Sequence, residues 1–327
     1  MAAVGPVDVI RFDEWMDRAL YGPSGFYTTG GRAGRRGDFL TSPEVGPLFG
    51  AVVARALDAE WKRLGCPSEF QVVEVGAGPG TLARSILAAE PGVLRHGALQ
   101  YTCVEVSEEQ RALHPNGVRS TAEFPNAPIT GMVLANELLD NLPFRLAVWD
   151  DGWREAVLFE DGGRWMETLA PFETVPSVLP LHGVPLGARA PIQEAACTWV
   201  ANTLGRIERG RLVVVDYCVG VTAALAMRPW RDWLRTYREQ DITADVCIDQ
   251  LVAVAGEPQS IRSQAQWLQL WDIDELVEEG RALWETRAHA PDLAALRGRS
   301  RVREAEALLD PNGLGGFTVL EWQRGTA

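Results

Sequence analysis

An amide and two carboxylates end an apolar run in the middle of the sequence. In VLANELLDNLPF, residues 133–144, Asn136 and Glu137 follow the apolar residues, and Asp140 comes one turn later. A short helix that starts at Asn136 would place Glu137 and Asp140 on one face. Capping alone explains these residue types, because Asn is a good N-cap and acids in a first turn gain from the helix dipole. Capping does not require a strand end, however, and we predict catalytic roles for all three residues.

A glycine-rich turn, EVGAGPG, precedes this segment. Gly76, Gly78 and Gly80 follow a β-rich run and open a helical one. Glycine lets a ligand approach the backbone closely, and a helix N-terminus adds N–H groups and partial positive charge. Position 81 is Thr, so the GxGxxG fingerprint of dinucleotide-binding proteins fails by one residue.

Two carboxylates accompany the turn and indicate its ligand. Glu74 lies two residues before the first glycine, and Glu105 ends the next predicted strand. Glu74 disfavours a pyrophosphate and favours the ammonium and sulfonium of S-adenosylmethionine, while Glu105 can accept hydrogen bonds from ribose hydroxyls. We therefore predict S-adenosylmethionine as the cofactor; a nicotinamide or flavin nucleotide and a turn without a ligand are the alternatives. The expected contacts in these segments are Glu74, Gly76, Ala77, Gly78, Gly80, Glu105 and Asn136.

The N-terminal segment GDFLTSPE, residues 37–44, has the pattern of a helix start. Thr41 or Ser42 can cap, a proline follows, and Glu44 can close a capping box. We expect this segment to fold over the cofactor as a lid, with Gly37, Thr41 and Ser42 as cofactor contacts. Glu44 joins Glu137 and Asp140 as a predicted substrate-binding residue; a capped surface helix is the alternative.

The elements that must position these residues alternate between strands and helices, which predicts a parallel, doubly wound sheet. Residues 145–169 instead alternate apolar and polar side chains around Asp-Gly and Gly-Gly turns, which predicts an antiparallel hairpin. The predicted strands are 70–75, 99–107, 131–137, 210–217 and 315–324, and the predicted helices are 12–20, 45–64, 81–89, 192–207, 263–270 and 273–288. The stretch 219–250 shows no regular pattern.

Composition limits the remaining possibilities. The chain has 327 residues, 46% hydrophobic and 23% charged, as in soluble globular proteins. No apolar run approaches the roughly 20 residues of a membrane span, and the first residues do not resemble a signal peptide, so we expect a cytoplasmic protein without membrane insertion. A net charge of -13 disfavours nucleic acid and favours a cationic substrate or a basic partner. Scattered cysteines and histidines predict no metal site.

The glycine turn and the acid after it resemble motif I of the class I methyltransferases, and other segments resemble a narrower family. GDFLTSPEVGPLFG, EVGAGPGTLARSIL, ANELLDNLPF and DITADVCID occur in this order, and together they resemble the MidA-like methyltransferases. The similarity runs from about residue 12 to residue 323. This family includes a mitochondrial complex I assembly factor that methylates a protein arginine. One departure is Cys218, which stands where the family tends to have glycine.

The resemblance implies an α/β fold: a Rossmann-like, mostly parallel, seven-stranded class I methyltransferase sheet with an N-terminal helical cap and inserted antiparallel hairpins. We expect the cap and lid over residues 1–65 and the core over residues 66–327, with insertions at about 145–190 and 219–260. The leading hypothesis is methyl transfer from S-adenosylmethionine to a protein arginine. A small-molecule N- or O-methyltransferase and a non-catalytic assembly factor for a respiratory complex are the alternatives.

Arginine methylation would give the opening carboxylates a definite task. A guanidinium is a poor nucleophile because its charge is delocalised and it stays protonated. A carboxylate that accepts two of its N–H groups can orient it and draw positive charge away from the attacking nitrogen. We expect Glu137 to do this, with Asp140 or Glu44 assisting and Asn136 shaping the pocket.

Overall fold

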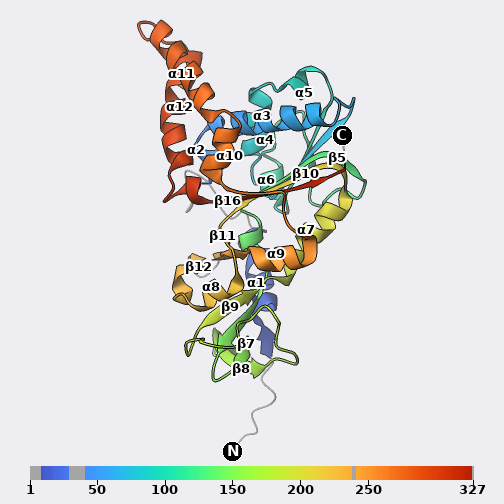
Figure 1. The fold of residues 1–327 in the computed structure, drawn as a ribbon, viewed down its shortest axis with the longest axis vertical. Helices are drawn as coiled ribbons and strands as arrows, with labels where there is room; N and C mark the ends of the chain where they lie inside the picture. The colour runs from blue at the N-terminus through green and yellow to red at the C-terminus, as the bar shows by residue number, and fades with distance from the viewer. Residues whose placement is uncertain (1–8, 29–40, 238–240, 326–327) are drawn as a thin grey trace, which may run out of the picture. The chain divides into compact units, whose positions relative to one another are not determined.

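The computed structural model describes residues 9–28, 41–237 and 241–325 (Figure 1). These residues pack as two compact units, which we call the larger and the smaller unit. The larger unit comprises Gly30–Glu137, Thr203–Asp216 and Pro258–Ala327, and the smaller unit comprises Met1–Thr29, Leu138–Asn202 and Tyr217–Glu257. The described residues 9–28 therefore fall in the smaller unit and the described residues 41–65 in the larger one, and both predicted insertions lie largely in the smaller unit.

A seven-stranded sheet organises the larger unit, in the order β15-β16-β10-β5-β2-β3-β4. The central strands are buried on both faces and read as near-continuous apolar runs, as parallel sheets require. β16 runs antiparallel to both of its neighbours, β10 and β15, and the other neighbouring strands of this sheet pair in parallel. The strands are β2 (Phe70–Val75), β3 (Leu99–Val104), β4 (Arg119–Thr121), β5 (Ile129–Asn136), β10 (Ile207–Asp216), β15 (Ser260–Ser263) and β16 (Thr318–Arg324). The predicted Rossmann-like, mostly parallel, seven-stranded sheet is confirmed.

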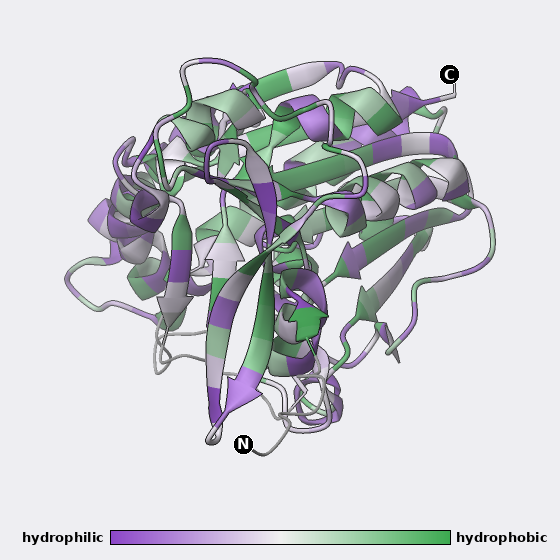
Figure 2. Ribbon diagram, turned by 90° about the horizontal axis from the view of Figure 1, so that it is seen from below, coloured by the Kyte–Doolittle hydropathy of each residue, from purple (hydrophilic) through white to green (hydrophobic). Residues whose placement is uncertain are grey.

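Helices of the larger unit cover this sheet. Figure 2 shows long hydrophobic stretches along several strands of the molecule and mixed hydrophilic and hydrophobic residues along its helices. A helix predicted over 45–64 is interrupted at Gly46, so that a short turn, α2, precedes the long α3. The bounds are α2 (Ser42–Val45), α3 (Pro47–Arg63), α4 (Thr81–Ala88), α5 (Gly92–Arg95), α6 (Glu108–Arg111), α10 (Gln264–Leu270), α11 (Ile273–Arg287), α12 (Leu293–Leu309) and η3 (Leu314–Gly316). Helix α7 (Glu194–Arg206) ends in the larger unit and begins in the smaller one.

Helix α12 was not predicted from the sequence. Its apolar spacing is interrupted by four arginines between residues 297 and 303, which hides the helical period. In the structure it packs against α11, and the two helices meet at Gly280 and Gly298, where a side chain on either glycine would collide with the opposite backbone. The hairpin is therefore held by close backbone approach as well as by apolar contacts.

The smaller unit is built on an antiparallel sheet whose five strands are β1 (Val9–Arg11), β6 (Arg145–Trp149), β7 (Trp153–Asp161), β8 (Arg164–Pro171) and β9 (Arg189–Ile192). The antiparallel hairpins predicted over 145–169 are confirmed. The stretch 219–250 is more regular than expected and contains β11 (Cys218–Val219), α8 (Thr222–Ala226), η2 (Trp230–Asp232), β12 (Leu234–Tyr237), β13 (Asp241–Ala244), β14 (Val246–Cys247) and α9 (Ile248–Ala255). Helix α1 (Phe12–Tyr21) and the turn η1 (Leu139–Asn141) complete this unit. Its core joins α1 residues such as Met16 to Phe144 and Trp233.

None of the helices within the described residues is long and apolar enough to cross a membrane.

Candidate cofactor and substrate site

The order in which successive strands join the sheet of the larger unit reverses between the parallel neighbours β2 and β5. Strands β3 and β4 extend to one side of β2, and β10 lies on the far side of β5. Ligands of open α/β sheets bind beyond the carboxyl ends of the strands at such a switch point. The glycine turn follows β2 and the Asn136–Glu137 pair follows β5, so both predicted groups stand at this place.

The glycine turn adopts backbone conformations that favour glycine. Gly76, Gly78 and Gly80 have φ angles of 69°, 51° and 74°, in the left-handed region that side chains disfavour. A Cβ on Gly80 would also lie 2.9 Å from Cδ of Pro115. The N–H of Ala77 donates to the carbonyl of Val104 at 3.1 Å, which ties the turn to β3.

Glu105 lies directly against this turn. Its Oε2 accepts a hydrogen bond from the N–H of Gly78 at 2.9 Å, and its Oε1 accepts one from the N–H of Ser107 at 2.9 Å. Each carboxylate oxygen has a further lone pair for another donor. The geometry therefore leaves capacity for the ribose hydroxyls that the sequence predicts here.

Glu74 is buried within the sheet. The Tyr101 hydroxyl donates to its Oε2 at 2.7 Å. Burial raises the pKa of the Glu74 carboxyl to about 7, against the opposing effect of hydrogen bonds from Tyr101 and from the N–H of Ala83. Because Ala83 lies in the first turn of α4, the Glu74 carboxyl links β2, β3 and the helix that follows the glycine turn. Its predicted direct contact with the cofactor stays a prediction.

Asn136 and Glu137 do not begin a helix, and the strand predicted over 131–137 is present as β5. Strand β5 continues through Asn136, whose strand partner is Val215, and Glu137 has a φ angle of 50°. The Glu137 N–H donates to the carbonyl of Val215 at 2.8 Å, which extends the contact with β10 by one residue. Helical structure begins only with η1 at Leu139. A left-handed non-glycine residue at a strand end is a feature that clusters at functional sites.

The side chains of this pair contact each other. Nδ2 of Asn136 donates to Oε1 of Glu137 at 3.1 Å. Oδ1 of Asn136 is buried and has no hydrogen-bond partner among the described residues. A buried acceptor without a partner is costly, so this oxygen suits a ligand that supplies a donor.

The Glu137 carboxylate lies in a strongly acidic setting. Burial and the nearby Asp216 raise its pKa to about 8, and Glu44 contributes in the same direction. Hydrogen bonds from Asn136 and from the Ser42 N–H act in the opposite direction. Asp216 was not predicted as a site residue, although its position at the end of the strand beside β5 is a signal that sequence reasoning could have used.

The α2 turn brings part of the predicted lid to this place. Thr41 occupies the position before α2 and makes no side-chain cap hydrogen bond, so the expected capping box is absent at this turn. Ser42 is fully buried. Its backbone N–H, and not its hydroxyl, donates a hydrogen bond to the Glu137 carboxylate. Glu44 lies two residues further in the same turn, and its charge also raises the pKa of Glu137. Gly37, the remaining predicted contact of the lid, lies outside the described residues.

Asp140 belongs to the smaller unit. It is buried in η1, and its Oδ1 accepts a hydrogen bond from Nδ2 of Asn141 at 2.8 Å. The Tyr27 hydroxyl donates to Oδ1 of Asn141 at 2.7 Å and lies 3.1 Å from Oδ1 of Asp241. Burial, followed by the charges of Asp241 and Asp140, raises the pKa of Tyr27 well above its ordinary value. A catalytic role for Asp140 stays a prediction.

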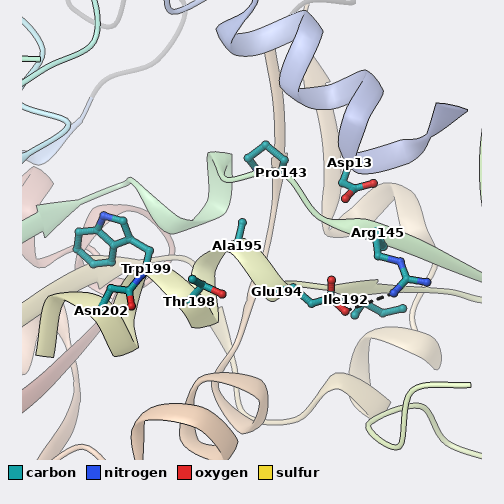
Figure 3. A pocket seen from close by; sticks show the side chains of 9 residues that line it. All are labelled: Asp13, Pro143, Arg145, Ile192, Glu194, Ala195, Thr198, Trp199 and Asn202. Carbon is teal, nitrogen blue, oxygen red and sulfur yellow. Dashed lines mark hydrogen bonds and ion pairs between the residues drawn. The ribbon is translucent and has the colours of Figure 1, made fainter. Parts of the chain in front are cut away.

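The smaller unit also contains an open hollow of about 480 Å³, between α1, β6 and α7 (Figure 3). The charged groups on its wall are already paired: Arg145 with Glu155 at 2.6 Å and with Glu194 at 3.3 Å, and Asp13 with Arg11 at 2.9 Å. Its lining residues are Asp13, Pro143, Arg145, Ile192, Glu194, Ala195, Thr198, Trp199 and Asn202. The predicted chemistry of the glycine turn belongs to the larger unit and not to this hollow.

The residues at the switch point fit S-adenosylmethionine. The orphaned Oδ1 of Asn136 can accept from an ammonium group, Glu105 can accept from ribose hydroxyls, and the carboxylates favour a sulfonium. The side-chain-free glycines admit the ligand close to the backbone. Within the three described stretches, no group of three or more His, Cys, Asp and Glu side chains is placed to hold a metal ion.

Comparisons with known proteins agree with this fit. A family model described as "Putative S-adenosyl-L-methionine-dependent methyltransferase" matches residues 52–266. The S-adenosyl-homocysteine complex of a Burkholderia thailandensis protein aligns with a TM-score of 0.78 and 25% identity, covering 98% of this chain and 89% of that one.

Two similar curated proteins carry a more specific name. The Drosophila melanogaster protein arginine methyltransferase NDUFAF7 homolog, mitochondrial, is 32% identical over 186 residues, which cover 48% of this chain and 42% of the relative. The Danio rerio protein arginine methyltransferase NDUFAF7, mitochondrial, is 27% identical over 297 residues, covering 78% and 70%. The chain therefore spans less than half the length of the Drosophila relative.

The seven-stranded sheet and the glycine turn after β2 define the fold of the class I S-adenosylmethionine-dependent methyltransferases. This agrees with the family match, which covers most of the chain. The chain belongs to the MidA-like family of these methyltransferases.

Proposed function

We propose that this chain transfers a methyl group from S-adenosylmethionine to the guanidinium of a protein arginine. The observation that carries the proposal is the position of the Glu137 carboxylate, which ends the switch-point strand beside Asp216. Two carboxylates at one strand edge favour a cationic acceptor over a neutral one. The names of the similar proteins and the net charge of -13 support the same choice.

The chemistry requires positioning above all. The attacking nitrogen must approach the methyl carbon in line with the carbon–sulfur bond, and holding the two groups in this geometry supplies much of the rate. The new bond joins nitrogen to methyl carbon, the carbon–sulfur bond breaks, and its electron pair stays on sulfur as a neutral thioether. The attacking nitrogen then loses one proton to solvent, which restores the charge of the methylated guanidinium.

Glu137 is proposed to orient the acceptor. Its raised pKa means that the carboxyl group holds a proton near neutral pH until a cation arrives, and the guanidinium then favours the charged form. The carboxylate accepts two N–H groups of the guanidinium and directs the third nitrogen toward the methyl group. Asn136 is proposed to bind two groups: its Oδ1 accepts a hydrogen bond from the cofactor, and its Nδ2 donates one to Glu137.

The remaining binding roles follow the same geometry. Glu105 is proposed to bind the ribose hydroxyls, and the glycine turn the rest of the cofactor, which supplies the methyl group as a sulfonium. Glu44 and Asp140 stay proposed substrate-binding residues. A protein substrate, the lack of a nucleic-acid partner and a cytoplasmic location remain predictions.

Labelled methyl transfer into a cell extract tests the proposal. The purified chain is incubated with methyl-labelled S-adenosylmethionine and extract, and the products are identified by mass spectrometry. Label on arginine supports the proposal. Label on a small molecule, or cofactor binding without any product, would instead favour the small-molecule enzyme or the assembly factor.

A further inference from the structure

The α2 turn is anchored by a buried side chain of α10. The Ser42 hydroxyl donates to Oε1 of Gln264 at 2.8 Å, and both residues are fully buried. Nε2 of Gln264 donates to the carbonyl of Leu308 at 3.3 Å, and its backbone N–H donates to the carbonyl of Phe317 at 2.7 Å. The hydroxyl of Ser42, which the sequence suggested for the cofactor, is therefore used to fix the turn.

A second anchor comes from α12. Oε2 of Glu304 accepts a hydrogen bond from the N–H of Leu48 at 2.8 Å, and its Oε1 accepts one from the hydroxyl of Ser300 at 2.5 Å. Leu48 lies in the first turn of α3, where N–H groups have no partner within the helix. Gly46 makes this contact possible, because a Cβ there would overlap the Glu304 carboxyl group.

The two anchors hold the chain on either side of the short segment from Ser42 to Leu48, which contains the α2 turn. Gln264 bonds the first residue of α2, and Glu304 bonds the start of α3 just after it. Between them, the Ser42 N–H hydrogen-bonds the Glu137 carboxylate, which also faces Asp216 and Glu44. The negative charges of Asp216 and Glu44 repel the Glu137 carboxylate. The Ser42 N–H attracts it, so the position of this N–H determines the position of the Glu137 side chain.

We propose that Gln264 and Glu304 are positioning residues for the reaction: they hold the α2 turn where its Ser42 N–H fixes the side chain of Glu137. This inference rests on the proposed role of Glu137. Helices α10 and α12 thus act through hydrogen bonds on a side chain at the end of β5.

The test uses the titration of Glu137, which needs no acceptor. The chain is labelled with ¹³C-glutamate, its carboxyl signals are followed by NMR against pH, and the Glu137 signal is assigned by its loss in Glu137→Gln. Glu304→Ala removes the acceptor of the Leu48 N–H, and Gly46→Ala keeps both partners but forces them apart. Both variants should raise the pKa of Glu137 by roughly half a unit to one unit, because the N–H donor favours the charged form.

Glu304→Gln is the conservative rescue. The amide oxygen can still accept from Leu48, and the amide nitrogen can donate to the Ser300 hydroxyl. We expect this variant to titrate like the unaltered chain.

Glu60→Ala is the matched control. Glu60 is also a buried carboxylate that bonds across the larger unit, with Arg63 at 2.6 Å and Arg211 at 3.3 Å. It lies about 18 Å along α3 from Leu48, at 1.5 Å per residue. Its loss should lower stability without moving the Glu137 titration.

An unchanged pKa of Glu137 in folded Glu304→Ala and Gly46→Ala would overturn the inference, as would an equal shift in Glu60→Ala. The proposed function is tested separately. If these shifts occur but no methyl transfer is found, the positioning holds and the proposed function fails.

Discussion

Glu137 and Asp216 end two neighbouring parallel strands, and the N–H of Glu137 donates to the carbonyl of Val215 at 2.8 Å. This register places two carboxylates at one edge of the sheet. The Glu137 pKa rises to about 8 because of burial and because of Asp216. Such an arrangement is unfavourable without a cation, which makes the pair suited to binding one.

The stability of the cofactor-free chain should fall as pH rises. Glu137 and Glu74 have pKa values of about 8 and about 7, above their ordinary value of 4.5. Between pH 4.5 and these values the folded chain binds more protons than the unfolded chain, so both groups stabilise the fold at low pH and lose that effect as pH rises. Glu137→Gln should flatten the dependence, as measured by urea unfolding at several pH values. An equally steep dependence in this variant would contradict the assignment.

Asp216→Asn should lower the pKa of Glu137. The substitution removes the second-largest cause of its elevation and leaves burial in place. The expected fall is about one unit, typical of a nearby like charge that is removed. The ¹³C titration of Glu137 measures it directly, and a rise in the pKa would show that Asp216 has another role.

Gly78→Ala should weaken cofactor binding by about tenfold or more, because it adds a Cβ where the glycine turn lets the ligand approach the backbone closely. The strain of an alanine in the left-handed region, about 1–2 kcal/mol, affects the stability of this variant and of the control alike. Gly78 has a φ angle of 51°, and a Cβ there would lie 3.1 Å from Oε1 of Gln110. Gly97→Ala is the matched control, since Gly97 has a φ angle of 73° and open space around it. Calorimetric titration with S-adenosyl-homocysteine should show normal affinity for Gly97→Ala only. Equal loss in both variants would point to a general effect on folding.

Tyr101→Phe should destabilise the chain by about 1–3 kcal/mol, because it removes the Tyr101 hydroxyl that donates to the buried Glu74 carboxyl. The loss should be larger above pH 7 than at pH 5, since the charged carboxylate depends on that hydrogen bond more than the protonated one does. Urea unfolding at the two pH values checks this. A loss of equal size at both would indicate that packing, and not the hydrogen bond, is what Tyr101 contributes.

The sequence was informative where residue type and backbone geometry coincide. Gly76, Gly78 and Gly80 predicted a turn that requires positive φ, and the apolar runs predicted the strands around it. The structure has both. The hairpins over 145–169 were equally clear from their alternation and turns.

The sequence was less informative where contacts between residues far apart in the chain determine the local structure or the partner of a side chain. The strand predicted over 131–137 is present as β5, and its pairing with β10 excludes the helix start that the capping preference of Asn136 allowed. Ser42 was one of two candidate caps, with Thr41, but its hydroxyl bonds Gln264, 222 residues away. Asp216 lies near Glu137 only because β10 pairs with β5 in the sheet. Local sequence patterns do not specify which strands are neighbours.

The most direct test of the central claim is methyl transfer by Glu137→Gln. With methyl-labelled S-adenosylmethionine and the arginine-bearing substrate found in cell extract, we expect transfer to fall at least about 100-fold, as for the loss of one key electrostatic contact. Cofactor affinity, measured by calorimetry, should stay nearly unchanged. Full turnover by Glu137→Gln on that substrate would contradict the account.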